Sequence, residues 1–139
     1  MKQYQRELSV PTHGQRLFDI TGGVAAVVRE AKVMTGMAHV FCRHTSASLI
    51  INENADAQVR HDLEAFLKRL VPDGDPHFIH TLEGPDDMAA HIKTALTATS
   101  LAVPIAGGKL ALGTWQGIYV FEHRVAAHER KIVVHVIGE

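Results

Sequence analysis

The C-terminal part of the chain, from Ser100 onward, predicts short β-strands separated by tight turns. The strands read SLAVPIA, KLALG, QGIYVFE and RKIVVHVI, and Gly107 and Gly108 lie between the first two. Two consecutive glycines favour a two-residue hairpin turn, because both can adopt positive φ angles without steric cost. Short strands joined by such turns pair antiparallel. This segment therefore restricts the chain to a fold with a largely antiparallel sheet.

The residues before this segment alternate between predicted strands and predicted helices. Strands are expected over residues 3–10, 16–20, 37–43 and 47–52. A first helix is expected from a Thr21 cap to residue 33, with Gly36 fitting its end. Further helices are expected over residues 55–70, capped by Asn54, and over residues 85–98, with Pro85 at the first position. Helices inserted between strands of one sheet are typical of the α+β class.

Each predicted helix carries an apolar face that is expected to pack on the sheet. The residues of these faces recur three or four positions apart. They are Val24, Val27, Val28 and Ala31 in the first helix, Val59, Leu63, Phe66, Leu67 and Leu70 in the second, and Met88, Ile92, Ala95 and Leu96 in the third. No linker or internal repeat divides the sequence, so we expect residues 1–139 to form one compact α+β domain.

Charge and hydropathy argue against two classes of partner. The 14 Lys and Arg residues and 15 Asp and Glu residues give a net charge of −1, whereas proteins that bind nucleic acid or anionic membranes usually carry a basic excess. No apolar run approaches the roughly 20 residues that span a bilayer, and the N-terminus has no signal-peptide core. The single cysteine, Cys42, cannot form an internal disulfide. We therefore expect a cytoplasmic protein that binds neither nucleic acid nor membrane.

Histidine is unusually frequent, with 10 residues in the chain, and imidazole serves both as a metal ligand and as a general base. The first candidate site is the stretch HTSASLIINENAD, residues 44–56. Strand alternation would place His44, Ser46 and Ser48 on one face, with His44 as metal ligand or base. The alternative is an edge strand with a solvated polar face. Ser46 is disfavoured as a nucleophile, because the G-x-S-x-G turn of hydrolases is absent.

The second candidate is the stretch HTLEGPDDMAAHIK. Here His80 precedes a predicted helix and His91 lies inside it. Together with His44 they would form a three-histidine site that suits Zn²⁺ with one open position. The alternative is that His91 is a core histidine with its hydrogen bonds satisfied, and sequence spacing does not decide between the two.

The third candidate is the stretch GTWQGIYVFEHR. Gln116, Glu122 and Arg124 share strand parity, so they would point to one face unless a bulge intervenes. Such a set could bind a polar, partly anionic ligand, because the planar guanidinium of Arg suits phosphate. The alternative is that these are solvated charges at the end of a strand.

These three stretches, in this order and spacing, resemble the YjbQ family, also described as secondary thiamine-phosphate synthase enzymes. The resemblance runs from about Arg16 to the closing IGE. It implies a compact α+β fold and a homotrimer, with a polar pocket near subunit boundaries and metal or sulfate-like ligands. It also implies a side activity that joins hydroxymethylpyrimidine diphosphate to thiazole phosphate and releases pyrophosphate.

The resemblance also maps the family's polar motif onto this sequence. The matching positions are His44, Thr45, Ser46, Asn52, Glu53 and Asp56, then His80, Glu83, Gly84, His91 and Lys93, then Gly113, Thr114, Trp115, Gln116, Glu122 and Arg124. Two departures occur outside the motif. Ala89 stands where the family usually has proline, and Gly22 and Gly23 stand where it often has charged residues.

Roles follow from the residue types at these positions. His44, His80 and His91 are candidate ligands for a divalent metal such as Zn²⁺ or Mg²⁺, and His44, His91, Glu122 and Arg124 are candidate catalytic residues. Candidate ligand contacts are Thr45, Ser46, Asn52, Lys93, Thr114, Trp115 and Gln116. Departure of a diphosphate would be assisted by a metal ion and cationic side chains.

Two alternatives to an enzyme remain open at the level of sequence. The first is a homotrimeric module that binds a metal or a small phosphorylated molecule or anion without turnover. The second is a structural trimer in which the polar residues serve assembly.

Overall fold

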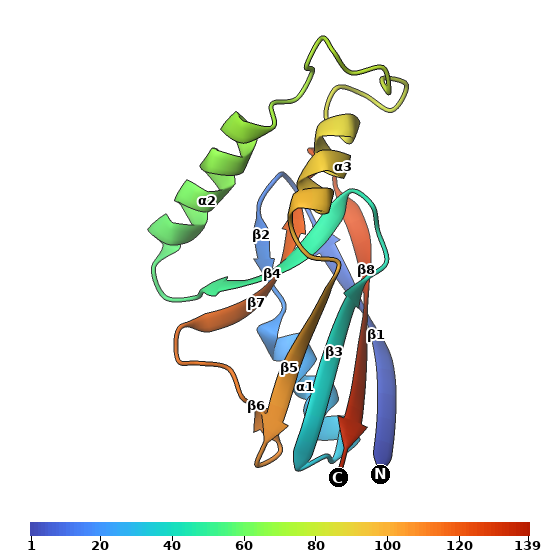
Figure 1. Cartoon of the computed structure of the whole chain (residues 1–139), viewed down its shortest axis with the longest axis vertical. Helices are drawn as coiled ribbons and strands as arrows, with labels where there is room; N and C mark the ends of the chain where they lie inside the picture. The colour runs from blue at the N-terminus through green and yellow to red at the C-terminus, as the bar shows by residue number, and fades with distance from the viewer.

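A computed structural model describes residues 1–139 and contains two antiparallel sheets and three helices (Figure 1). The elements are β1 (Lys2–Thr12), β2 (Leu17–Asp19), α1 (Thr21–Ala31), β3 (Thr35–Cys42), β4 (Ala47–Glu53), α2 (Ala57–Leu70), α3 (Asp87–Leu96), β5 (Ser100–Ala106), β6 (Lys109–Leu110), β7 (Gln116–Glu122) and β8 (His128–Gly138). The α+β class expected from the sequence is confirmed. The predicted glycine hairpin is confirmed too, because Gly107 and Gly108 adopt φ angles of 58° and 77° between β5 and β6.

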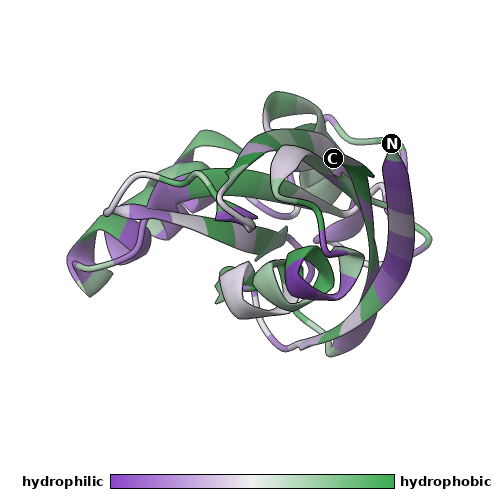
Figure 2. Ribbon diagram, turned by 90° about the horizontal axis from the view of Figure 1, so that it is seen from below, coloured by the Kyte–Doolittle hydropathy of each residue, from purple (hydrophilic) through white to green (hydrophobic).

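The larger sheet has the strand order β1-β8-β3-β5-β6, and the smaller has the order β2-β7-β4. In the larger sheet the two longest strands, β1 and β8, pair along their whole length. In Figure 2 the ribbon of β1, which begins at the N-terminus, is largely hydrophilic, as suits an edge strand. The smaller sheet brings the end of β7 next to the start of β4, where Glu122 pairs with Ala47.

The main core lies between α1 and the sheets. Val24, Val27, Val28 and Ala31 of α1 are buried in it, as their spacing predicted. Alternate residues of β8, including Ile132, Val134 and Val136, supply the facing layer. The single cysteine is buried in the same core and is a free thiol. None of the helices is both long enough and apolar enough to cross a membrane.

Two predicted features around α1 and α2 differ in the structure. Gly36 lies within β3 and does not end α1. Glycine is required at this position because a Cβ atom there would lie 2.2 Å from the backbone carbonyl oxygen of Ile137. Lys32, in the left-handed conformation, ends α1. The N-cap of α2 is Asp56, whose carboxylate accepts a hydrogen bond from Gln58 N at 2.8 Å. The predicted cap, Asn54, instead donates its side-chain amide to the start of β7.

The apolar faces of α2 and α3 were predicted only in part. Only Leu67 of the predicted α2 stripe is buried, and α2 contacts the smaller sheet through polar side chains, since Glu64 Oε2 accepts a hydrogen bond from Leu17 N of β2 at 2.8 Å. In α3 the buried side includes Ala89, Ala90, Lys93 and Thr94, whereas Ala95 and Leu96 are exposed. The predicted inward residues Met88 and Ile92 are half-buried, so the apolar periodicity pointed to one edge of the buried side of this helix.

Candidate functional site

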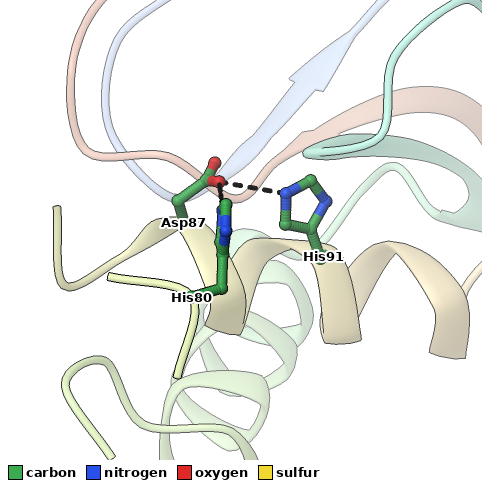
Figure 3. Close-up of side chains that lie close together, drawn as sticks. All are labelled: His80, Asp87 and His91. Atoms are coloured by element: carbon green, nitrogen blue, oxygen red, sulfur yellow. Dashed lines mark hydrogen bonds and ion pairs between the residues drawn. The ribbon is translucent and has the colours of Figure 1, made fainter. Parts of the chain in front are cut away.

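The N-terminal end of α3 brings two histidines to one carboxylate. Asp87 is the first residue of the helix, His91 lies one turn later, and His80 comes from the preceding loop. The Nε2 atoms of His80 and His91 lie 2.7 Å and 3.0 Å from Asp87 Oδ2 (Figure 3). All three ligand atoms fall within 4.8 Å of one another. Ligand atoms around tetrahedral zinc lie about 3.3 Å apart, so a small outward shift would admit an ion.

The surroundings of His91 favour a cation at this point. Its Nδ1 lies 2.9 Å from the carbonyl oxygen of Thr45, which can only accept a hydrogen bond. Its Nε2 faces the carboxylate oxygen of Asp87, which is also an acceptor. A neutral imidazole has one N–H and cannot donate to both. His91 therefore has to carry a second proton or direct the Nε2 lone pair at a metal ion, with Nδ1–H bonded to Thr45 as in many metal sites.

Arg124 orients the carboxylate of Asp87. Its Nη1 donates to Asp87 Oδ1 at 2.7 Å, and its Nε donates to Asp86 Oδ2 at 3.0 Å. Its Nη2 donates to the carbonyl oxygen of Glu83 at 2.9 Å. This leaves Asp87 Oδ2 for the two histidines. One guanidinium thus joins the end of β7 to the loop and to the first turn of α3.

Electrostatics keep both aspartates ionised. Burial by itself raises the pKa of Asp87, but hydrogen bonding to His80 and the charge of Arg124 outweigh it, so the pKa lies below its ordinary value. The pKa of Asp86 is also lowered, because hydrogen bonds from Val125 N and Arg124 exceed the effect of burial. In return, Asp86 and Asp87 raise the pKa of Arg124 against the opposing effect of burial. The site therefore presents a carboxylate anion at neutral pH.

Glu122 lies beneath Arg124 in a fully buried polar network. Its carboxylate accepts hydrogen bonds from Thr12 Oγ1 at 2.5 Å and from the Nε and Nη2 atoms of Arg130 at 2.7 Å and 2.5 Å. It also accepts from the backbone N–H of Arg124 at 3.0 Å. Its pKa is lowered, because these hydrogen bonds outweigh the effect of burial. In this chain Glu122 thus holds the backbone of Arg124 in place.

His44 lies outside the group formed by His80, Asp87 and His91 within one chain. Its Nε2 accepts a hydrogen bond from Lys131 N at 2.7 Å, which puts the ring proton on Nδ1. Its pKa is lowered, first by burial and then by the charge of Arg130. A cavity of about 410 Å³ lies against His44 and Thr45. The imidazole of His44 is therefore neutral, and it lines a cavity separate from the His80–Asp87–His91 group.

The other predicted ligand contacts fall into separate places. Ser46 accepts a hydrogen bond from Arg130 through its hydroxyl oxygen, and Asn52 accepts one from the backbone of Glu53. Thr114, Trp115 and Gln116 lie at the start of β7, at the opposite end of that strand from Glu122. A seven-residue strand spans about 20 Å, so this group is well separated from Arg124. Lys93 lies on the buried side of α3.

Sequence reasoning missed Asp87 as a member of the site. Its spacing of four residues from His91 was the available signal, because residues at i and i+4 share a helix face. Two histidines and one carboxylate could hold a metal ion and leave coordination positions open, which is the ligand set of several catalytic zinc centres. Imidazole ligands also favour Zn²⁺ over Mg²⁺, which prefers oxygen.

The sequence analysis also did not predict a buried hydrogen bond between Ser48 and His123. Ser48 was expected on a polar face, but it is fully buried, and its Oγ lies 2.8 Å from the Nε2 of buried His123. Thr97 Oγ1 donates to the same Ser48 oxygen, and His123 Nδ1 has no hydrogen-bond partner. Burial, followed by the charges of Lys93 and Arg130, lowers the pKa of His123 to about 3. The imidazole is therefore neutral in the fold.

This low pKa predicts acid sensitivity. The pKa of His123 is lowered on folding, so the unfolded chain binds the extra proton first, and stability present above pH 6.5 is lost as the pH falls. Between about pH 6.5 and 4.5 the wild type should lose about 2 kcal/mol more unfolding free energy than His123→Gln. Urea unfolding at a series of pH values measures this. The exposed His13→Gln control should follow the wild type, and parallel curves for wild type and His123→Gln would contradict the prediction.

Comparison with known proteins places the whole chain in one group of relatives. The model of the family described as "UPF0047 protein YjbQ-like" matches residues 6–139. The UPF0047 protein sll1880 of Synechocystis sp. is 49% identical over 138 residues, which cover 99% of this chain and 94% of that protein. The UPF0047 protein YjbQ of Escherichia coli O157:H7 is 39% identical over 137 residues, which cover 98% and 99%.

Solved structures agree with these relatives in fold. A protein of the YjbQ/UPF0047 family from Clostridium acetobutylicum superposes with a TM-score of 0.87 at 41% identity, over 95% of this chain and 99% of that one. A YbjQ-like protein of unknown function from Sulfolobus solfataricus P2 superposes with a TM-score of 0.90 at 28% identity, over 99% of both chains. The two-sheet fold described above is thus also that of these proteins.

Proposed function

This chain belongs to the UPF0047 family of YjbQ-like proteins, and we propose that it is a metal-assisted enzyme acting on a small phosphorylated molecule. One observation carries the proposal: both ring nitrogens of His91 face hydrogen-bond acceptors, Thr45 O and Asp87 Oδ2. A second proton on His91 or a divalent ion held by His80, Asp87 and His91 resolves that conflict, and we propose the ion because a second imidazole nitrogen, His80 Nε2, also faces Asp87 Oδ2. Because two of the three ligands are imidazoles, Zn²⁺ is the ion we propose.

The proposed reaction is the one implied by the family resemblance. A ring nitrogen of the thiazole phosphate attacks the methylene carbon of the pyrimidine diphosphate, a C–N bond forms, and the C–O bond breaks. Pyrophosphate leaves with the electron pair of that bond. The bound ion would act as a Lewis acid on the phosphate oxygens. Asp87 keeps its charge at neutral pH and is held by Arg124, so the ligand set is oriented before substrate arrives.

Space for a substrate lies beside the group. A cavity of about 390 Å³ is lined by residues of the loop between α2 and α3 and includes His80. This volume falls within the roughly 300–1,000 Å³ of small-molecule sites. The site of the reaction would thus lie between this loop and the first turn of α3.

The experiment that tests this function measures metal and turnover on the same purified sample. We expect about one Zn²⁺ per chain, and release of pyrophosphate from hydroxymethylpyrimidine diphosphate and thiazole phosphate. His91→Ala should lose both the metal and the turnover, which also excludes a contaminating synthase. His61→Ala, an exposed histidine on α2, is the matched control and should keep both.

The outcomes separate the candidate functions. Zinc without pyrophosphate release would support a binding module without turnover. Absence of zinc from a protein reconstituted with excess metal would overturn the metal assignment itself, and turnover that survives His91→Ala would overturn its role in the reaction.

We also propose that the chain assembles as a homotrimer, as the family resemblance implies. The support is the apolar side of α2, where Val59, Phe66 and Leu70 are exposed. Exposed apolar groups that lie together on one helix mark a contact surface. Ile79 and Leu82, on either side of His80, are 98% and 99% exposed. Assembly through these surfaces would cover the loop that carries one of the metal ligands.

Replacing Phe66 with glutamate should break this assembly. A charge placed in an apolar interface is costly to bury, so the variant should show the mass of one chain where the wild type shows that of three. Light scattering after size exclusion measures this mass. Gln58→Glu adds the same charge at an exposed polar position of α2 and should remain trimeric. A wild type with the mass of one chain would contradict the proposal.

A further inference from the structure

A small cavity lies on the side of α3 that packs against the rest of the molecule, and its lining includes no member of the His80–Asp87–His91 group. Its volume is about 120 Å³, and its lining residues are Gln15, Lys68, Val71, Asp73 and Lys93. This volume is well below the roughly 300–1,000 Å³ of pockets that enclose whole organic ligands. The cavity therefore suits one compact group.

Lys93 gives this cavity its chemical character. The residue is only 2% exposed, and its ammonium group takes part in no ion pair or hydrogen bond of the structure. The opposite charges of Asp73 and Asp86 act on this ammonium group without direct contact, and a charge on so little exposed a side chain is stabilised by a direct anionic partner. Because the side chain lines the cavity, a partner for its ammonium group has room to bind there.

The other lining groups select the kind of partner. Lys68 adds a second positive charge from α2, which excludes a metal cation and favours an anion. Asp73 adds one negative charge, and its Oδ2 accepts a hydrogen bond from Gln15 Nε2 at 3.0 Å. Asp73 Oδ1 receives no hydrogen bond within the chain, so it can accept one from a ligand that carries a proton. Gln15 is itself fixed, because the same Nε2 also donates to His123 O at 3.1 Å.

We propose that this cavity is a binding site for a protonated phosphate group. Lys68 and Lys93 would neutralise its charge, and the P–OH group would donate a hydrogen bond to Asp73 Oδ1. Sulfate has the same shape and carries no proton at neutral pH, so it would face the Asp73 carboxylate with a lone pair. The two lysines thus give affinity for a tetrahedral oxyanion, and Asp73 gives selectivity for phosphate over sulfate.

Titration calorimetry with inorganic phosphate and with sulfate tests this site. The protein is treated with a chelator, so that binding does not depend on a metal, and the titrations are repeated in His91→Ala. We expect phosphate to bind about tenfold or more tightly than sulfate, the usual effect of one hydrogen bond to a charged group. Lys93→Met and Lys68→Gln should each weaken phosphate binding about tenfold. Asp73→Asn should bring the phosphate and sulfate affinities close together.

Controls make the test specific to this cavity. Lys109→Met removes one exposed lysine on β6, outside the cavity, and should bind phosphate as the wild type does. If Lys93→Met does not fold, Lys68→Gln decides, because Lys68 is exposed and its loss does not disturb the core. Competition by glycerol phosphate would assign the site to the phosphoryl group of a larger molecule, and failure to compete would assign it to free phosphate.

Two results would overturn the assignment. The first is no phosphate binding, or binding that both lysine variants leave unchanged. The second is equal affinity for sulfate and phosphate in the wild type. Phosphate binding that persists in His91→Ala and disappears in Lys68→Gln would support this site even if the metal assignment fails, because none of its lining residues belongs to the metal-binding group.

Discussion

The Asp87→Asn variant is expected to bind Zn²⁺ more than about 100-fold more weakly than the wild type, or not at all. Asp87 supplies the only negative charge among the three ligand atoms, and it is 2% exposed. The amide has no charge to offset the cost of taking a cation out of water. It also places a neutral group against the guanidinium of Arg124, which now bonds Asp87 Oδ1 at 2.7 Å. Loss of a supporting partner alone lowers metal affinity about 10–100-fold, so loss of a ligand should exceed that range.

Competition with a coloured zinc chelator gives the affinity directly. Asp62→Asn removes the same charge from an exposed position of α2 and should leave zinc binding unchanged. A melting temperature close to that of the metal-free wild type would show that Asp87→Asn is still folded. Equal zinc affinity in wild type and Asp87→Asn would eliminate this carboxylate as a ligand.

The Arg130→Met variant should lose about 3–5 kcal/mol of unfolding free energy. Arg130 is 4% exposed and forms a paired contact with Glu122, which is completely buried. Removing the guanidinium leaves the buried Glu122 carboxylate with too few hydrogen-bond donors. The free energy lost in this way is larger than the net stabilisation that the ion pair provides. Arg124 should suffer as well, because its backbone N–H is bonded to the same carboxylate. Zinc affinity is therefore expected to fall together with stability.

Urea unfolding measures the stability change, and a double variant separates its causes. Adding Glu122→Leu to Arg130→Met removes the stranded charge and should restore part of the lost free energy. The exposed pair of Arg43 and Glu7 is the control, since Arg43→Met should cost less than about 1 kcal/mol. A loss of that small size for Arg130→Met would show that the buried network contributes little.

Much of the fold could be predicted from the sequence because its signals are local. The Gly107-Gly108 hairpin, the strand before it and the buried face of α1 depend on residues close together in the chain, and all three were confirmed. The strand predicted over residues 109–113 is shorter in the structure, where β6 covers only Lys109–Leu110. The burial of the apolar residues of α2 could not be predicted from such local signals. Apolar periodicity shows that a helix has a face to cover, but not whether its own chain covers it.

The candidate site was predicted in part for a similar reason. His80 and His91 were identified as candidate ligands, and the structure brings them together at Asp87. The supporting contacts could not be predicted, because they join segments far apart in sequence. Arg124 reaches Asp87 across 37 positions, and Thr45 reaches His91 across 46. His44, the third predicted ligand, lies outside this group in the structure.

The metal-ligand residues are close together in the sequence, whereas Thr45 and Arg124, which orient them, are far away, and this difference would affect a transfer of the site to another protein. The three ligand residues lie within the short stretch from His80 to His91, so little loop-closure entropy opposes their meeting. A graft of that stretch into another scaffold would carry the complete ligand set. It would leave behind the Thr45 carbonyl that fixes the imidazole tautomer and the Arg124 guanidinium that fixes the carboxylate. A host that supplies one acceptor and one guanidinium at those two points would recover the preorganised geometry, whereas a host without them would have to order the ligands at the expense of metal affinity.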